Sequence, residues 1–123
     1  MKVLVCGSRS WRDRRRIRAR LLHLPRGSHV IHGGARGADR LAGDVARALG
    51  FQVEEVPAVW RTGGSVFDRS AGFRRNLRML DMKPDLVIAF WDGRSTGTAH
   101  TIREAHKRGL AVEVHHPRPD RSS

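Results

Sequence analysis

The chain has 123 residues, of which 39% are hydrophobic and 6% aromatic. This length suits one domain with a single layered core and excludes two such domains. Its 24 lysines and arginines exceed its 12 acidic residues, which makes a basic protein with a formal charge of +12. Such a charge favours association with polyanions, so nucleic acid has to be considered as a partner. A GC-rich coding sequence also raises the arginine content of a protein, without any such partner. The charge alone therefore leaves both interpretations open.

The only cysteine, Cys6, lies in an apolar run near the start of the chain. An intrachain disulfide is therefore excluded, and a reducing compartment is expected. No base lies nearby in the sequence, which favours a small buried residue over a nucleophile. No apolar stretch approaches the length of a signal peptide or a membrane span, so we expect a cytoplasmic protein with no membrane partner.

Five short apolar runs predict the strands of a sheet. In chain order they are Val3–Cys6, His29–His32, Phe51–Val56, Leu86–Phe90 and Leu110–Val114. Continuous apolar runs of this kind are typical of strands buried on both faces of a parallel sheet. The run at 86–90 is the most hydrophobic and predicts a central strand, whereas the alternation at 51–56 favours a position near the edge.

Apolar residues at helical spacing fill the intervals between these strands. They predict one helix after residue 13 and others at about 38–49, 71–80 and 98–107. Asp13 is placed to cap the first of these helices. Residues 58–70 show no clear periodicity and predict a surface loop.

The alternation of strands and helices predicts an α/β fold. We expect a single Rossmann-like three-layer domain, in which a mainly parallel five-stranded sheet has helices on both faces. The domain should span residues 2–114, and residues 115–123 should form a disordered tail. If the strand order is 3-2-1-4-5, the first and fourth strands flank the point where the order reverses, and ligands of such sheets bind there.

Glycine-bearing loops follow three of the predicted strands, at 7–9, 33–39 and 93–98. Glycine permits positive φ and a close approach of the backbone to a ligand, and the first turn of a following helix offers free N–H groups to an anion. One such loop is a weak signal, because any strand-to-helix turn tolerates glycine. Three of them at one edge of a sheet predict a crevice that binds phosphate or carboxylate.

Other side chains give weaker signals. The polar face of the first predicted helix is able to contact a phosphodiester backbone, but it lacks aromatic residues for stacking on bases, which favours a solvated surface. Trp91, beside the third glycine loop, is a better candidate for base stacking than Trp60. The spacings of His32, His100 and His106 match no compact ligand motif, so neither a metal site nor a cofactor is predicted. The polar face of the first predicted helix, which we call its basic face, carries the arginines Arg12, Arg14, Arg15, Arg16, Arg18 and Arg20.

Four short motifs together resemble one protein family. They are Gly7-Ser8-Arg9, the stretch 32–39 beginning His-Gly-Gly, the stretch 71–76 ending Arg-Asn, and the stretch 93–100 containing Gly97-Thr98. In combination they are similar to the YspA/YpsA-related branch of the SLOG superfamily, over residues 2 to about 114. This superfamily includes the LOG phosphoribohydrolases, the DNA-processing protein DprA and nucleotide sensor domains, all with a Rossmann-like fold.

The resemblance implies a site for a nucleotide or a nucleotide-derived ligand, with phosphate held by the backbone of the loop at 93–98. Hydroxyl and guanidinium groups suit phosphate, and Asp39 or Asn76 can accept from ribose hydroxyls. Asp39 can also stabilise the first turn of its own helix. The residues expected at the site are Gly7, Ser8, Arg9, Gly33, Gly34, Gly37, Asp39, Arg75, Asn76, Gly93, Ser95, Thr96, Gly97 and Thr98.

The sequence departs from the LOG phosphoribohydrolases at their catalytic position. In those enzymes a glutamate follows the Gly-Thr pair within a few residues, whereas here the first is Glu104, nearly two helical turns beyond Thr98. A carboxylate there should lie too far from an anomeric carbon to stabilise its developing charge, and we expect it to pair with Arg108 instead. Asp39 and Glu104 remain weak candidates for a catalytic acid, so whether the protein is an enzyme stays open.

The sequence therefore favours a nucleotide-binding or ligand-sensor module. Two alternatives remain: an N-glycosidase that acts on nucleoside monophosphates, and a protein that binds single-stranded DNA in the manner of DprA. Many relatives form dimers, so a homodimer is also considered.

Overall fold

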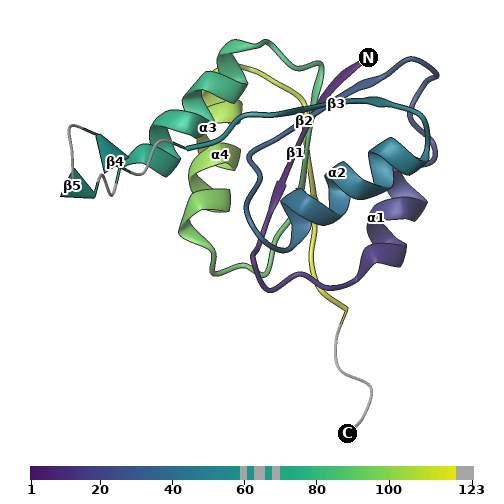
Figure 1. Cartoon of the computed structure of the whole chain (residues 1–123), viewed down its shortest axis with the longest axis horizontal. Coiled ribbons are helices and arrows are strands. Elements are labelled where there is room, and N and C mark those ends of the chain that lie inside the picture. The colour runs from purple at the N-terminus through teal and green to yellow at the C-terminus, as the bar shows by residue number, and fades with distance from the viewer. Residues whose placement is uncertain (59–60, 63–65, 68–69, 119–123) are drawn as a thin grey trace, which may run out of the picture.

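The computed structural model describes residues 1–58, 61–62, 66–67 and 70–118. A five-stranded parallel sheet forms the centre of the fold, with the strand order β3-β2-β1-β6-β7 (Figure 1). The predicted strand order and the Rossmann-like α/β fold are thus confirmed. The strands are β1 (Lys2–Gly7), β2 (His29–His32), β3 (Gln52–Glu55), β6 (Leu86–Phe90) and β7 (Val112–His115).

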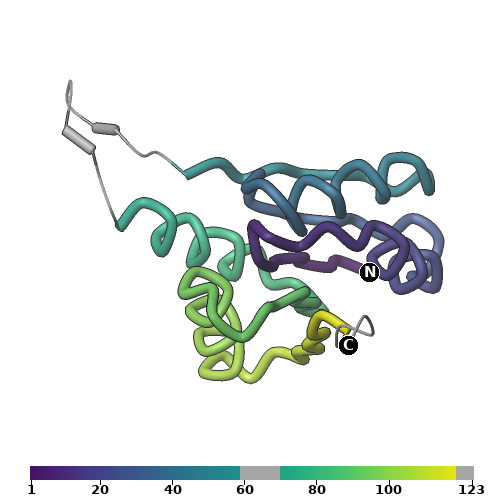
Figure 2. The backbone as a smooth tube through the Cα atoms, turned by 90° about the horizontal axis from the view of Figure 1, so that it is seen from below, coloured from purple at the N-terminus to yellow at the C-terminus, as the bar shows by residue number. Residues whose placement is uncertain are grey.

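Helices cover both faces of the sheet, as Figures 1 and 2 show. On one face α1 (Arg14–Leu21) packs beside α2 (Ala38–Ala48), and on the other α3 (Ala71–Asp81) packs beside α4 (Thr96–Lys107). These are the three layers that the sequence predicts.

The alternation of side chains along β1 explains why there are two cores. Val3 and Val5 belong to the apolar cluster shared with α1 and α2, whereas Leu4 and Cys6 belong to the cluster shared with α3 and α4. All four side chains are buried because β1 pairs with a strand on either side and is covered on both faces. Burial raises the pKa of the Cys6 thiol, which agrees with a structural rather than a nucleophilic role.

The ends of the helices differ slightly from the prediction. Asp13 caps α1 as predicted, because its Oδ1 accepts a hydrogen bond from the backbone N–H of Arg16 at 3.2 Å. The helix ends at Leu21, although the apolar spacing continues to buried Leu24. Helix α4 begins at Thr96, two residues before the predicted start.

A pair of two-residue strands lies where the sequence predicts a surface loop. Strands β4 (Arg61–Thr62) and β5 (Val66–Phe67) pair in antiparallel fashion, and Figure 1 shows them away from the main sheet. Strands of two residues are too short to produce a recognisable alternation in the sequence.

Strand β7 extends to His115, one residue beyond the predicted end of the domain. The backbone N–H of Trp91 donates to the carbonyl of His115 at 2.8 Å, and the His115 ring stacks on Phe90 with centroids 5.1 Å apart. His115, the first residue of the predicted tail, thus belongs to the sheet. Residues 119–123 lie outside the described part of the chain.

Within the described ranges, none of the helices is both long enough and apolar enough to cross a bilayer. The same residues hold no group of three or more His, Cys, Asp or Glu side chains that is suited to a metal ion.

Candidate functional site

A cleft of about 510 Å³ opens at the carboxyl ends of β1 and β6, between which the strand order reverses. The loops after β1, β2 and β6 and the helices α3 and α4 form its walls. The residues that line it are Cys6, Gly7, Arg9, Ser10, Ala35, Asp39, Gly72, Phe73, Arg75, Asn76, Met79, Asp92, Ser95, Thr96, Gly97, Thr98 and Thr101.

The first turn of α4 forms one wall of this cleft. Oδ1 of Asp92 accepts hydrogen bonds from the backbone N–H groups of Arg94 at 2.8 Å and Ser95 at 2.9 Å, which fix the loop before the helix. These bonds lower the pKa of Asp92. The Ser95 side chain caps no N–H group of α4, and the first N–H groups of a helix have no intrahelical acceptor. The amides of 96–98 are therefore available to an anion.

Gly97 leaves this turn open to the cleft. A Cβ atom built on Gly97 would meet no atom within 4 Å. On the same turn the hydroxyl oxygens of Ser95 and Thr98 lie 3.2 Å apart, so both are close to the exposed amides. Together they offer hydroxyl and amide donors to one bound group.

Asp39 supplies a buried carboxyl group at the first turn of α2. Its Oδ2 accepts a hydrogen bond from the backbone N–H of Gly33 at 2.9 Å, and the N–H of Ala35 also donates to this carboxyl group. Burial raises the pKa of Asp39 to about 6, although these amides and the guanidinium groups of Arg75 and Arg9 oppose the shift. The carboxyl group thus holds the glycine loop in shape and also lines the cleft.

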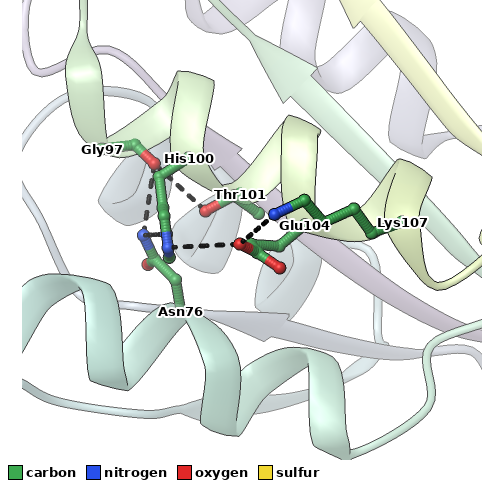
Figure 3. Close-up of polar contacts among 6 residues, drawn as sticks. All are labelled: Asn76, Gly97, His100, Thr101, Glu104 and Lys107. Carbon is green, nitrogen blue, oxygen red and sulfur yellow. Dashed lines mark hydrogen bonds and ion pairs between the residues drawn. The ribbon is translucent and has the colours of Figure 1, made fainter.

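Arg75 and Asn76 connect α3 to the other two walls. Nη1 of Arg75 donates to the carbonyl of Gly33 at 2.6 Å, and its Nε donates to Oδ1 of Asn76 at 2.9 Å. Nδ2 of Asn76 in turn donates to the carbonyl of Gly97 at 3.2 Å (Figure 3). A Cβ atom at Gly33 would overlap the Arg75 guanidinium, which would then have to move from this position.

The loop after β1 contributes one free cation. The Arg9 side chain lines the cleft and has no hydrogen-bond or ion-pair partner among the described residues. Ser8, in contrast, is buried: its Oγ accepts from the N–H of Asp92 at 2.9 Å, and its own N–H donates to the carbonyl of Phe90 at 2.9 Å. Ser8 therefore ties the loops after β1 and β6 together beneath the cleft.

The chain is similar to several known proteins. A family model for the YspA, cpYpsA-related SLOG family matches residues 1–63. The Gene 61 protein of Mycobacterium phage D29 is 42% identical over 118 residues, which are 90% of this chain and 93% of that protein. The chain belongs to the YspA, cpYpsA-related SLOG family. The resemblance inferred from the four sequence motifs is thereby confirmed.

Two solved structures share the SLOG fold of this chain. DNA processing protein A (DprA) from Streptococcus pneumoniae has a TM-score of 0.76 at 20% identity, with 92% of this chain and 49% of that chain covered. The structural genomics target TM1055 has a TM-score of 0.65 at 25% identity, with 90% of this chain and 71% of that chain covered. This SLOG chain spans about half the length of the DprA structure, and that likeness shows the fold.

Several of the residues predicted for the SLOG site lie elsewhere. Ser8 is buried below the cleft, and Gly37 packs against backbone carbonyls of the loop after β1. Gly93 is exposed at positive φ outside the cleft lining. The Nε1 of Trp91 donates to the carbonyl of Ser95 at 3.0 Å, and this ring does not line the cleft. Trp60 lies outside the described residues.

Gly33 and Gly34 line a second, smaller cleft of about 270 Å³, which adjoins the first and shares Arg9, Ala35 and Arg75 with it. The sequence places both glycines at the carboxyl end of β2, but it does not show that Arg75 of α3 lines the same cleft.

The structure adds aromatic surface that the sequence analysis missed. Phe73 of α3 lines the cleft and is 43% exposed. One face of its ring stacks on His100, with centroids 4.4 Å apart and planes at 25°. At its position in the apolar pattern of α3, Phe73 is indistinguishable by sequence from a core residue.

Glu104 lies outside the cleft lining. Figure 3 shows its carboxylate between His100, whose Nε2 is 4.0 Å from Oε1, and Lys107, whose Nζ donates to Oε1 at 3.4 Å. The predicted pair with Arg108 is wrong. That guanidinium donates instead to Asp81 of α3 at 2.8 Å, because the packing of α3 against α4 offers a nearer partner.

The basic face of α1 is only partly free. Nε of Arg20 forms an ion pair with Glu113 at 2.5 Å, and Arg16 donates to the carbonyl of His116 while covering the ring of Trp11. The remaining side chains of this face are exposed to solvent. They are Arg12, Arg14, Arg15 and Arg18.

Proposed function

We propose that the larger cleft binds a nucleotide or a nucleotide-derived small molecule, and that the protein acts as a binding or sensor module. Membership of the SLOG family supports a nucleotide-related function in general. The observation that carries the proposal is that one cleft combines the open first turn of α4 with the guanidinium groups of Arg9 and Arg75, which come from two other elements. Helix amides and guanidinium groups are the donors that phosphate prefers.

The donors suggest how such a ligand lies. The phosphate would contact the amides of 96–98, with Ser95 and Thr98 hydroxyls beside it and the unpaired Arg9 guanidinium facing it. The base would stack on the free face of Phe73, the aromatic ring that lines the cleft. Asn76 already uses both ends of its amide, so its role is to position Arg75 and the first turn of α4.

Binding without cleavage fits the acidic groups better than catalysis does. Glu104 does not line the cleft, and its carboxylate is engaged by Lys107. Asp39 lines the cleft, but its carboxyl group accepts two backbone N–H bonds that maintain the glycine loop. A glycosidase needs a carboxyl group free to interact with the developing oxocarbenium ion.

The first experiment identifies the ligand. Small molecules released by denaturing the purified protein are analysed by mass spectrometry, and AMP and any nucleotide found are then titrated by calorimetry against wild type, Arg9→Gln and Arg18→Gln. We expect saturable binding that Arg9→Gln weakens about tenfold, as expected for one lost charge-assisted contact. Arg18→Gln removes the same charge from an exposed site on α1 and should change the affinity less than twofold.

Two outcomes would replace this proposal. Free adenine that accumulates from AMP with time would show an N-glycosidase, for which Asp39 and Asp92 are the acidic residues that line the cleft. Binding to single-stranded oligonucleotides that strengthens with length and falls steeply with salt, without saturable nucleotide binding, would show a DNA-binding protein.

A further inference from the structure

The second cleft is strongly cationic. Like the first cleft it is lined by Arg9 and Arg75, and among the described residues its lining includes four guanidinium groups and one carboxylate, that of Glu55. Its four arginines are Arg9, Arg36, Arg40 and Arg75. So many cations around a small space favour an anionic occupant.

Two of these cations are available to a ligand. Arg36 is exposed and has no hydrogen-bond or ion-pair partner among the described residues. Arg40 donates from Nε to the carbonyl of Gly34 at 3.1 Å, which anchors its side chain at the cleft and leaves its terminal nitrogens without a partner in the described structure. Both residues line the second cleft and not the first.

One anionic group cannot contact the donors of both clefts, because these donors come from different residues. None of the residues at 95–98 lines the second cleft, and neither Arg36 nor Arg40 lines the first. A phosphate on the first turn of α4 therefore leaves the guanidinium groups of Arg36 and Arg40 without an anionic partner. Arg75, whose guanidinium donates to the carbonyl of Gly33, lines both clefts.

We propose that the ligand is a nucleotide with two separate phosphate groups, the second of which lies in the second cleft against Arg36 and Arg40. This inference rests on the proposed function of the larger cleft. Nucleoside bisphosphates carry the two phosphates on different ribose oxygens, whereas nucleoside diphosphates and dinucleoside diphosphates carry them joined through one bridging oxygen. Glu55, whose carboxylate lies against Gly34, is placed to accept from a hydroxyl group of the same ligand.

The test compares probes with one and with two phosphates. AMP, ADP, adenosine 3′,5′-bisphosphate and diadenosine diphosphate are titrated by calorimetry at one fixed salt concentration, because exposed charges are screened by salt. Wild type should bind at least one of the two-phosphate probes about tenfold or more tightly than AMP, and the probe with the largest gain identifies how the phosphates are linked.

Variants assign this gain to the second cleft. Arg36→Gln with Arg40→Gln should abolish the gain and change the affinity for AMP less than twofold, whereas Arg36→Lys with Arg40→Lys should retain part of it. Arg47 lies on α2 with Arg40 but outside both clefts, so Arg47→Gln should leave the affinity for every probe unchanged. Circular dichroism checks that each variant is folded.

The failures of the two proposals are distinguishable. If AMP binds but no two-phosphate probe gains affinity, or if the double Gln variant weakens AMP and the other probes alike, the second phosphate site is refuted and the nucleotide site stands. If none of the probes binds to wild type, the proposed function of the larger cleft fails, and this inference fails with it.

Discussion

The side-chain amide of Asn76 donates to the backbone carbonyl of Gly97 at 3.2 Å. The same side chain accepts from Nε of Arg75, whose Nη1 holds the carbonyl of Gly33. A single buried amide thus connects the glycine loop after β2 to the first turn of α4. The geometry of the cleft depends on this connection, because its two sides belong to elements that do not pair within the sheet.

Replacement of Asn76 by alanine should destabilise the protein and weaken nucleotide binding. The variant leaves buried groups without their partners, at a cost of about 2 kcal/mol in the free energy of unfolding. Urea denaturation measures this cost, and calorimetry with AMP measures the affinity. Arg78→Ala, an exposed change on the same helix that removes one surface hydrogen bond to the carbonyl of Pro57, serves as the control and should cost less than about 1 kcal/mol. Unchanged affinity in Asn76→Ala would show that this amide serves stability alone.

Gly37 should tolerate no side chain. Its φ is 79°, and a Cβ atom there would overlap the backbone carbonyls of Ser8 and Arg9. Gly50 has a similar φ of 86° but open space around it. We expect Gly50→Ala to cost about 1 kcal/mol from the backbone alone and Gly37→Ala at least about 3 kcal/mol, since overlap adds to strain. Equal losses in urea denaturation would contradict the close packing of the two loops.

The buried carboxyl group of Asp39 should make stability depend on pH. Its pKa rises from 3.8 in the unfolded chain to about 6 in the folded protein, so only well below pH 3.8 do both states hold the proton. Between these two pKa values the unfolded chain ionises while the folded chain keeps the proton, so stability falls as the pH rises, and above about pH 6 the loss is complete. Relative to Asp39→Asn, wild type should lose about 2 kcal/mol between pH 4.5 and 7.5, since each pKa unit is worth about 1.4 kcal/mol.

Urea denaturation of wild type and Asp39→Asn at both pH values measures this difference, in which the titration of all other groups cancels. The free energy of unfolding of wild type should fall relative to that of Asp39→Asn as the pH rises. A constant difference would mean that the Asp39 carboxyl group is as well solvated in the folded chain as in the unfolded one.

The sequence predicted the parts of the site that depend on strand order. Apolar runs located the strands, and the glycine loops after them come together because the carboxyl ends of parallel strands share an edge. Thr96, Gly97 and Thr98 at the start of α4 could be selected in this way, as could Arg9.

What the sequence could not predict is where side chains point. Ser8 and Trp91 lie in the correct loops but hydrogen-bond to the protein itself, and Phe73 resembles a core residue although it lines the cleft. The contact between Arg75 and Gly33 joins residues 42 positions apart, and it holds at the cleft a guanidinium-bearing residue that lines both spaces. Such long-range packing leaves no trace in local spacing.

The central claim, that a nucleotide phosphate binds at the first turn of α4, is tested most directly at Gly97. A tryptophan there would fill the open space of the cleft, whereas an alanine fits without a contact, so Gly97→Ala is the matched control. Calorimetric titration with AMP should show binding to wild type and Gly97→Ala within about threefold of one another and no binding to folded Gly97→Trp. The tryptophan side chain leaves no room for a ligand at this turn. Unchanged binding to Gly97→Trp would therefore contradict the claim, because AMP would have to bind elsewhere.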